Sequence, residues 1–286
     1  MITNLLSRVA ETGPNVHVAP NVVTHIGGLN ITNSILYGWI STLFIILLMI
    51  AVARRVTVKP KGGFSQFIEA GAEFIVNLVE SAFDDKARAR KYVPFFVTLF
   101  FFILMSNWLG LLPIVGEGFH VGSSPLFRPF TADLNGTLAA GIFTMLFVYA
   151  ASVRESGGFG KYMRHFFVGS PANPLYFVIG LLEILTDLTR VFSLSLRLFL
   201  NVTIGEIVIG VFSYLGHIAA PLSALPFTLV ELFVGALQAY IFTILSLMYL
   251  AIAVNHASEH AIDHEESLTH DTVPAKMGLT PTGISS

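Results

Sequence analysis

The sequence has no cysteine and few charged residues, and both shortages limit what the chain can be. Without cysteine it has no disulfide, no thiolate metal site and no thiol nucleophile. Only 12% of its 286 residues are charged, about half the usual share of a soluble domain, whereas 54% are hydrophobic. The net charge is −2 and no basic patch with interleaved aromatic residues is present, so nucleic acid is not an expected partner. This composition favours a membrane protein.

Several motifs that mark enzymes are missing as well. The patterns GxxxxGK[ST] and GxGxxG do not occur, so the chain has no recognisable loop for ATP or a dinucleotide. No GxSxG supports a Ser-His-Asp arrangement, and we expect neither catalytic residues nor a cofactor. Histidines near the end of the chain would suit a metal if a helix continued through them, but we interpret them as part of a solvated tail and expect no metal. These are His256, His260, His264 and His270.

Long apolar runs dominate what the chain does contain. Five are long enough to cross a membrane, at about 34–53, 93–115, 134–153, 175–215 and 222–256. Backbone groups in lipid must bond to one another, and the alternating segments of about ten residues that build a membrane barrel are absent. The sequence therefore predicts an all-α polytopic membrane protein with five transmembrane helices.

The last two runs are longer than an upright span requires. Helices over 175–215 and 222–256 would be about 50–60 Å long, whereas about 20 residues suffice to cross the bilayer. We expect a long, strongly tilted hairpin that is broken near 216–221. Two ordinary spans with interfacial extensions are the alternative.

One further segment is amphipathic. Residues 64–83 have apolar side chains at helical spacing but also carry Glu69, Glu73 and Glu80. This pattern predicts a helix that lies at the membrane interface and does not span it.

Basic residues predict the orientation. They gather in the segments 54–91 and 154–164, whereas the loop 116–133 holds only Arg128 and the loop 216–221 holds none. Since basic loops stay in the cytoplasm, the N-terminus is expected outside and the C-terminus in the cytoplasm.

The chain is thus expected to have three parts. An external segment, 1–33, precedes a membrane domain, 34–256, and a polar, loosely ordered tail, 257–286. No basic stretch followed by an apolar one occurs in the first 30 residues, so no cleaved signal peptide is expected. We expect the chain to lie in the inner membrane of a bacterium, because its N-terminal segment lacks a transit-peptide pattern. An organellar inner membrane is the alternative.

Charged side chains interrupt the run 175–215. Glu183, Arg190 and Arg197 are seven residues apart and share one stripe of a helix, with Asn201 close to it. Glu206 lies about 180° around and about 13 Å along the axis from Arg197, so the two cannot form a simple ion pair within the helix. Arginine cannot release its proton, and we therefore expect the partner of Arg197 on another helix or another chain.

The other polar residues allow structural interpretations. Arg190 could pair with Asp187 or Glu183, and Asn201 could bridge two helices. On the run 222–256, Glu231 and Gln238 share a face, as on an ion path. Glu231 could instead be a protonated buried carboxyl.

Four stretches resemble subunit a of the rotary F-type ATP synthases. SLSLRLFLNVTIGE at 193–206 is similar to the family signature SLxLRLFxNxxxGE. ILMSNWLGLLPI at 103–114, TADLNGTLA at 131–139 and ELFVGALQAYIFTILSLMYL at 231–250 also resemble family sequences. Order and spacing agree from about residue 30 to 256.

The resemblance implies that Arg197 is the family's essential arginine beside a rotating ring of c subunits, with Asn201 and Gln238 as polar residues near it. A carboxyl of each arriving c subunit would then be the missing partner of Arg197. The chain would be a non-catalytic stator subunit that couples proton flow to ring rotation and ATP synthesis. Its partners would be the c-ring, the peripheral-stalk b subunits, the rest of the ATP synthase and the lipid bilayer.

The resemblance also implies two offset half-channels for the ion. Glu206 and Glu231 match the half-channel that opens to the outside, and Asn107 matches a polar site on the second span. Glu183 matches an acid of the cytoplasmic half-channel. Many family members have histidine at the position of Glu231, and two carboxyls would share a proton more readily than a Glu–His pair. The cargo is expected to be H⁺, with Na⁺ left open.

Two other classes of function are less favoured by the sequence. An independent proton channel or secondary transporter would be favoured by internal inverted repeats, and none is found. A membrane-embedded enzyme would need a nucleophile or metal constellation, and none stands out.

Overall fold

The structure is a computed structural model of the chain. It describes residues 21–26, 29–54, 63–83, 85–112, 115, 120–121, 124–125, 127–155, 158, 174–216 and 219–271. Within these ranges it does not describe the side chains of residues 26, 29, 64, 120, 121, 124, 125, 174–177, 179, 180, 183, 184 and 255–271.

Helices make up most of the described chain, and five of them are long and apolar enough to cross a membrane. These five are α2 (Asn33–Ala53), α5 (Val93–Gly110), α6 (Leu134–Glu155), α8 (Pro174–Gly216) and α9 (Ala220–Asp271). The others are α3 (Phe64–Ser81), α4 (Lys86–Ala89) and the 3₁₀ helix η1 (Phe130–Ala132). The predicted all-α polytopic membrane fold is confirmed.

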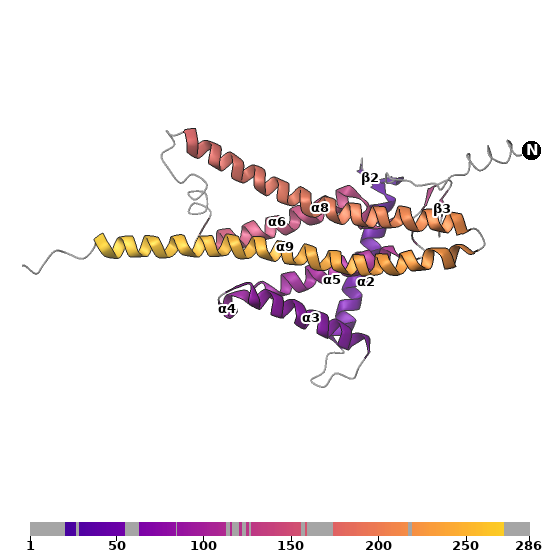
Figure 1. The fold of residues 1–286 in the computed structure, drawn as a ribbon, viewed down its shortest axis with the longest axis horizontal. Coiled ribbons are helices and arrows are strands. Elements are labelled where there is room, and N and C mark those ends of the chain that lie inside the picture. Colours follow the sequence, from indigo (N-terminus) through magenta and orange to yellow (C-terminus); the bar gives the residue numbers. More distant parts are fainter. Residues whose placement is uncertain are drawn as a thin grey trace, which may run out of the picture.

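The two longest helices form the predicted hairpin. In Figure 1, α8 and α9 run antiparallel, lie together where α8 ends and α9 begins, and diverge toward their other ends. Gly216 ends α8, and Pro221 stands in the first turn of α9, where its missing N–H is harmless. The tilt of this hairpin against the membrane stays a prediction.

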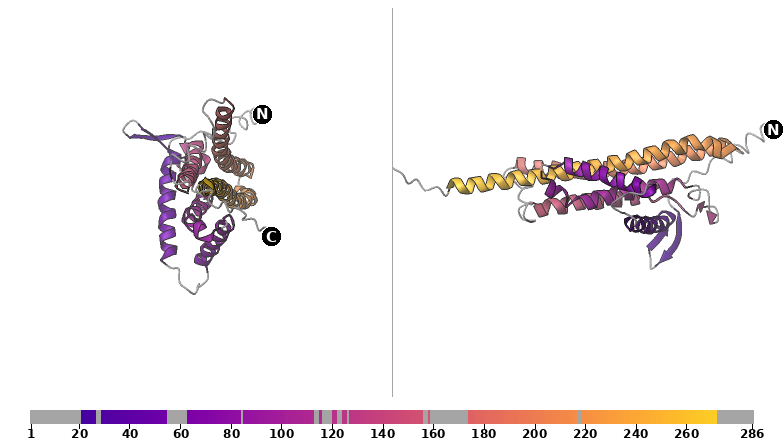
Figure 2. Two further views of the ribbon diagram at one scale, coloured as in Figure 1. Left: turned by 90° about the vertical axis from the view of Figure 1, so that its left-hand side faces the viewer. Right: turned by 90° about the horizontal axis from the view of Figure 1, so that it is seen from below.

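The other helices pack around the hairpin. Helix α5 packs against α9, and α6 packs against both α8 and α9. Figure 1 and Figure 2 show α2 standing across the direction of the hairpin and α3 lying on the far side of α5. The buried core therefore runs from α3 through α5 to α9, with Ile75, Phe96, Ile103, Phe242 and Leu250 among its most buried side chains.

Helix α3 has the amphipathic character that the sequence predicts. Ile68, Ile75 and Val79 form a buried row at helical spacing, whereas Glu69 and Glu73 are exposed. Helix α3 is not among the candidate spans, and its place at the membrane interface stays a prediction.

Two features differ from expectation. Helix α9 continues to Asp271, although the chain from residue 257 was expected to be loosely ordered. No glycine or proline interrupts 257–271, and Pro274 is the first residue that would end a helix. The histidines of this segment lie beyond the described side chains.

Two small antiparallel hairpins were also not predicted. Strand β1 (Val22–Ile26) pairs with β2 (Leu29–Thr32), and β3 (His120–Val121) pairs with β4 (Ser124–Pro125). For the first, Gly27-Gly28 between runs of β-branched residues is a recognisable signal in the sequence.

A short segment around η1 fills the junction of four helices. Helix η1 contacts α2, α5, α6 and α8. Glycines let it approach: Gly38 and Gly136 face Phe130, and Gly110 faces Pro129. The Phe130 ring also lies 5.8 Å from that of Phe102. The described segment 127–133, just before α6, is thus folded into the helix bundle.

A polar cluster joins the beginning of α5 to the end of α6. The Tyr92 hydroxyl donates a hydrogen bond to Oε1 of Glu155 at 2.9 Å. Arg88 and Lys91 lie 3.8 Å and 3.7 Å from the same carboxylate. Burial, and then the hydrogen bond and negative charge of Glu155, raise the pKa of Tyr92 to about 12.

We expect Gly136→Ala to destabilise the chain. A Cβ at position 136 would lie 2.6 Å from both the ring and the carbonyl oxygen of Phe130, so backbone must move. Overpacking of this kind costs about 1–3 kcal/mol. Gly210→Ala is the control, because a Cβ there meets no atom within 4 Å. Thermal unfolding of the purified variants should show a lower midpoint for Gly136→Ala only. Equal midpoints would show that the junction is loosely packed.

We expect Tyr92→Phe to change how stability depends on alkaline pH. Tyr92 keeps its proton to a higher pH in the folded chain than in the unfolded chain, so its contribution is complete below pH about 10 and is lost as the pH rises through about 12. The unfolding midpoint of the wild type should therefore fall more steeply over this range than that of the variant. Parallel curves would contradict the raised pKa.

Candidate functional site

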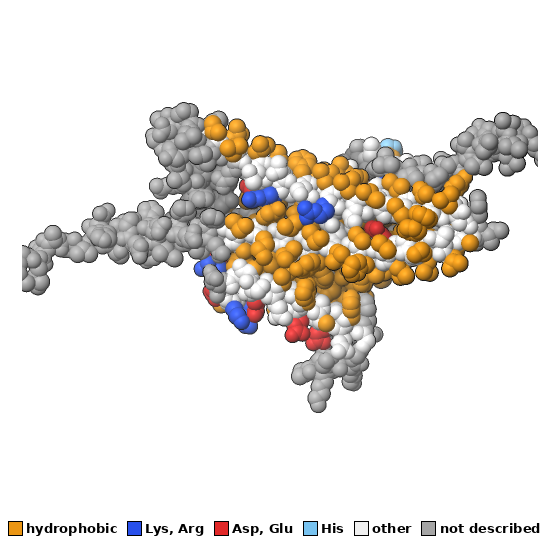
Figure 3. Space-filling view, in the orientation of Figure 1, with side chains coloured by type: hydrophobic (Ala, Val, Ile, Leu, Met, Phe, Trp, Pro, Cys, Tyr) orange, Lys and Arg blue, Asp and Glu red, His pale blue; other side chains and the backbone are white. Residues whose placement is uncertain are grey.

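Arg197 lies on an exposed, apolar face of α8. Its side chain is exposed, and so are those of its neighbours Leu196, Leu200 and Ile204. Figure 3 shows basic side chains over α8 set within an apolar surface. Among the described residues no carboxylate lies within 4.0 Å of Arg197. The guanidinium is therefore presented outward.

The other arginine of α8 is bound within the chain. Nη1 of Arg190 lies 2.9 Å from Oδ1 of Asp187, and its guanidinium carbon lies 4.9 Å from the centre of the Tyr249 ring. Pairing with Asp187 was one of the two alternatives expected, and it is confirmed. The ion pair thus lies within α8, and the cation–π contact with Tyr249 links α8 to α9.

Glu206 and Glu231 meet where α8 and α9 cross. The carboxyl group of Glu231 packs directly on Gly205, the residue before Glu206. Both carboxyl side chains are half-buried, and they interact electrostatically. Any side chain at position 205 would overlap the carboxyl group of Glu231, so glycine is needed for this close approach.

Helix α5 is hydrogen-bonded to α9 close to Glu231. Nδ2 of Asn107 donates to the Gly235 carbonyl oxygen at 3.1 Å, and Nε1 of Trp108 donates to the Leu232 carbonyl oxygen at 3.0 Å. Gly235 again permits the contact, because a Cβ there would lie 3.3 Å from that of Asn107. Gln238 is 5% exposed and follows on the same helix.

Several polar atoms around these helices are buried without a hydrogen-bond partner in the described part of the chain. On α8 they are Nδ2 of Asn201 and Oγ1 of Thr203, and on α5 they are Oγ of Ser106 and Oδ1 of Asn107. Buried polar groups in proteins are nearly always bonded, often to water. These atoms are therefore suited to a hydrated path between the helices.

The structure brings together some of the predicted residues. Glu206 meets Glu231, and Asn107 meets the segment of α9 between Glu231 and Gln238. Arg197 lies outside this group, on the exposed face. Glu183 is part of α8, but its side chain is not among those described.

One residue of this site was not predicted. Arg128, before η1, is 5% exposed and interacts electrostatically with Glu206. Its Nη2 donates to the Ala132 carbonyl oxygen at 3.0 Å. The signal in the sequence was weak: Arg128 is the single basic residue of the loop 116–133. Within the described residues, no group of three His, Asp or Glu side chains is placed to hold a metal ion.

The sequence of the chain is similar to those of known proteins. A family model described as ATP synthase A chain matches residues 35–251. The chain is 29% identical over 273 residues to ATP synthase subunit a of Myxococcus xanthus, covering 91% of this chain and 84% of that protein. It is 33% identical over 266 residues to ATP synthase subunit a of Chlorobium phaeobacteroides, covering 88% and 73%.

Some relatives are much longer. ATP synthase subunit a of an Anaeromyxobacter species is 32% identical over 235 residues, which are 79% of this chain and 54% of that protein. The chain thus spans about half the length of this relative.

Proposed function

This chain belongs to the ATP synthase A chain family and is a multi-pass subunit of the ATP synthase membrane sector, and we propose that it forms the stationary proton path of that sector. Two offset half-channels would lead to and from a rotating c-ring, and Arg197 would face the ring. The subunit would be non-catalytic and would couple proton flow to rotation. The observation that carries this proposal is the exposed position of Arg197 on the apolar face of α8.

An exposed arginine on an apolar helix face needs a partner. In lipid such a charge costs from about 2.5 kcal/mol to well over 10 kcal/mol. The described residues offer Arg197 no carboxylate within 4.0 Å, whereas Arg190 has Asp187. A c subunit that brings a carboxyl to this face would supply the partner. Arg197 would favour the ionised form of that carboxyl and repel a proton that tried to pass directly between the half-channels.

The external half-channel would run along the polar atoms between α5, α8 and α9. Glu206 and Glu231 would pass the proton, and Asn107, Gln238 and Asn201 would hold water along the way. The buried polar atoms without partners support this path. Glu183, nearer the start of α8, would belong to the cytoplasmic half-channel.

The wider setting follows from the same assignment. The long hairpin of α8 and α9 would lie strongly tilted along the curved outside of the c-ring, and b subunits would contact other parts of the membrane domain, 34–256. The external segment 1–33 and the cytoplasmic tail 257–286 would lie on opposite sides of a bacterial inner membrane. The translocated ion would be H⁺, unless the ring selects Na⁺.

Replacing Arg197 tests the proposal most directly. In inverted vesicles with the assembled complex, we expect Arg197→Ala to abolish ATP-driven acidification, while the passive proton leak after removal of the catalytic head persists or rises. Arg190→Ala is the matched control and should keep most of the pumping, because Arg190 is paired with Asp187 inside the chain. Near wild-type pumping by Arg197→Ala would show that this arginine is structural.

Replacing Gly205 tests the external path. Gly205→Ala should displace the carboxyl group of Glu231 and lower pumping by roughly tenfold to a hundredfold, since misplacing a functional group by about 1 Å can cost that much. Adding Glu231→Asp, which shortens the side chain, should restore part of the rate. Gly210→Ala is the control, since its Cβ would meet nothing within 4 Å. If Gly205→Ala pumps normally, the contact of Glu231 with Gly205 is not part of the path.

A further inference from the structure

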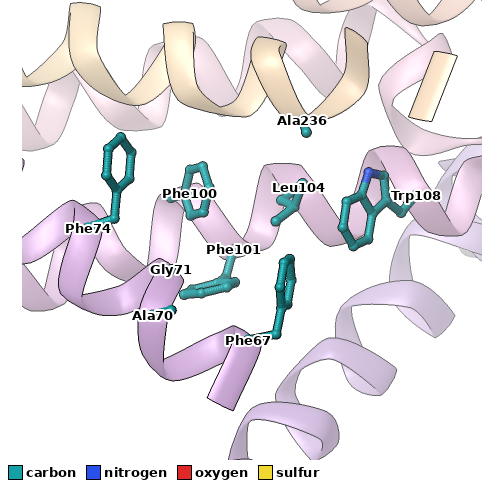
Figure 4. A pocket seen from close by; sticks show the side chains of 9 residues that line it. All are labelled: Phe67, Ala70, Gly71, Phe74, Phe100, Phe101, Leu104, Trp108 and Ala236. Atoms are coloured by element: carbon teal, nitrogen blue, oxygen red, sulfur yellow. The ribbon is translucent and has the colours of Figure 1, made fainter. Parts of the chain in front are cut away.

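An apolar cavity of about 230 Å³ lies where α3, α5 and α9 meet. Figure 4 shows the side chains that line it, most of them aromatic and none of them charged. The one polar side-chain atom in this lining is Nε1 of Trp108, and it already donates to the Leu232 carbonyl oxygen. Water would find no partner in such a space, so the cavity suits an apolar occupant.

Helix α3 uses a separate stripe of residues for this cavity. Phe67, Gly71 and Phe74 line it at helical spacing, whereas the row with Ile68 and Ile75 packs into the protein core. The side chains of Phe67 and Phe74 are 50% and 51% exposed, so the cavity opens to the surroundings of the chain. Small residues keep the space open: a Cβ at Gly71 would lie 3.0 Å from the Phe101 ring.

The size of the cavity limits what can enter it. A sphere of 230 Å³ is about 8 Å across, narrower than an α-helix with its side chains, which measures about 10–12 Å. This space therefore suits a single flexible hydrocarbon chain better than a whole helix of a partner subunit. Because the chain is a multi-pass membrane protein, hydrocarbon is also the medium around the apolar surfaces of α5 and α9.

We propose that this cavity, called here the acyl pocket, binds one acyl chain of a membrane phospholipid. The acyl chain enters past Phe67 and Phe74 and ends against Leu104, Trp108 and Ala236. Burial of apolar surface drives the binding. The acyl chain also makes van der Waals contacts with side chains that would otherwise line an empty space.

An acyl chain bound in the acyl pocket would stabilise the position of Asn107 in the proposed proton path. Leu104 and Trp108 flank Asn107 on α5, and Ala236 follows Gly235 on α9. The Asn107–Gly235 hydrogen bond thus lies directly beside the pocket. The inference depends on the location of the chain in a membrane and does not depend on the proposed proton path.

The two tryptophans of the chain make the pocket measurable. Trp39→Phe leaves Trp108 as the only tryptophan, and Trp108→Phe leaves Trp39, which is 63% exposed and reports ordinary lipid contact. Each full-length variant is placed in bilayers of phosphatidylcholine, either plain or brominated in the middle of the acyl chain. Bromine quenches tryptophan on contact. We expect Trp108 to lose most of its fluorescence in the brominated bilayer.

Filling the acyl pocket is the decisive comparison. Ala236→Leu puts a larger side chain into it, whereas Ala139→Leu makes the same change at an exposed position of α6. Ala236→Leu should remove most of the quenching of Trp108 and leave that of Trp39 unchanged, and Ala139→Leu should alter neither. Trp108 that is unquenched, or equally quenched in both alanine variants, overturns the proposal.

A second measurement uses the assembled complex and does not depend on fluorescence. A phospholipid with a photoreactive acyl chain is added, and its attachment sites are mapped. We expect attachment to residues 67–74 and 100–108, reduced by Ala236→Leu and unchanged by Ala139→Leu. Attachment that avoids both segments, because a protein partner covers the pocket in the complex, overturns the proposal.

Discussion

An arginine side chain keeps its charge wherever it lies, and this property governs the surroundings of Arg197. Helix α8 places that charge on an exposed face beside Leu196, Leu200 and Ile204, so the charge needs water or a carboxylate that the described residues do not supply within 4.0 Å. Arg190, two turns earlier, shows the opposite arrangement, with Asp187 and Tyr249 around it. The same helix thus carries one arginine that is paired within the chain and one that is exposed with no described carboxylate beside it.

The other contacts of the site depend on close packing of helices at two glycines. Gly205 lets the carboxyl group of Glu231 reach the backbone beside Glu206, and Gly235 lets Asn107 reach the backbone of α9. Both contacts join different helices; a side chain at position 205 would overlap the carboxyl group of Glu231, and one at position 235 would press on Asn107. The polar residues can lie inside an apolar bundle because the helices that carry them are held this closely, which gives each buried polar group a defined set of neighbours.

The sequence predicts the helices well and their meeting points less well. Apolar runs mark α2, α5, α6, α8 and α9, because a span in lipid needs a length that few soluble helices reach. Helical spacing also places Arg197 and Glu206 on different sides of α8.

What the sequence does not reveal depends on contacts between distant segments. Nothing in the local pattern indicates that Arg128, in a loop, is buried and interacts with Glu206, or that Glu231 packs on Gly205. The extension of α9 to Asp271 is unexpected for another reason: its polar composition predicts loose order, although polar residues without glycine or proline can continue a helix.

The segment around η1 has a consequence for how the chain is assembled. Phe130 lies in a junction formed by α2, α5, α6 and α8. Helix α8 begins more than forty residues after Phe130 in the sequence, so it is synthesised last of the four. During synthesis this loop therefore leaves the ribosome before its final neighbours exist. The junction can be completed only when α8 has entered the membrane. The packing of Phe130 in this junction is therefore a late event, and the folding of the middle of the chain depends on the insertion of α8.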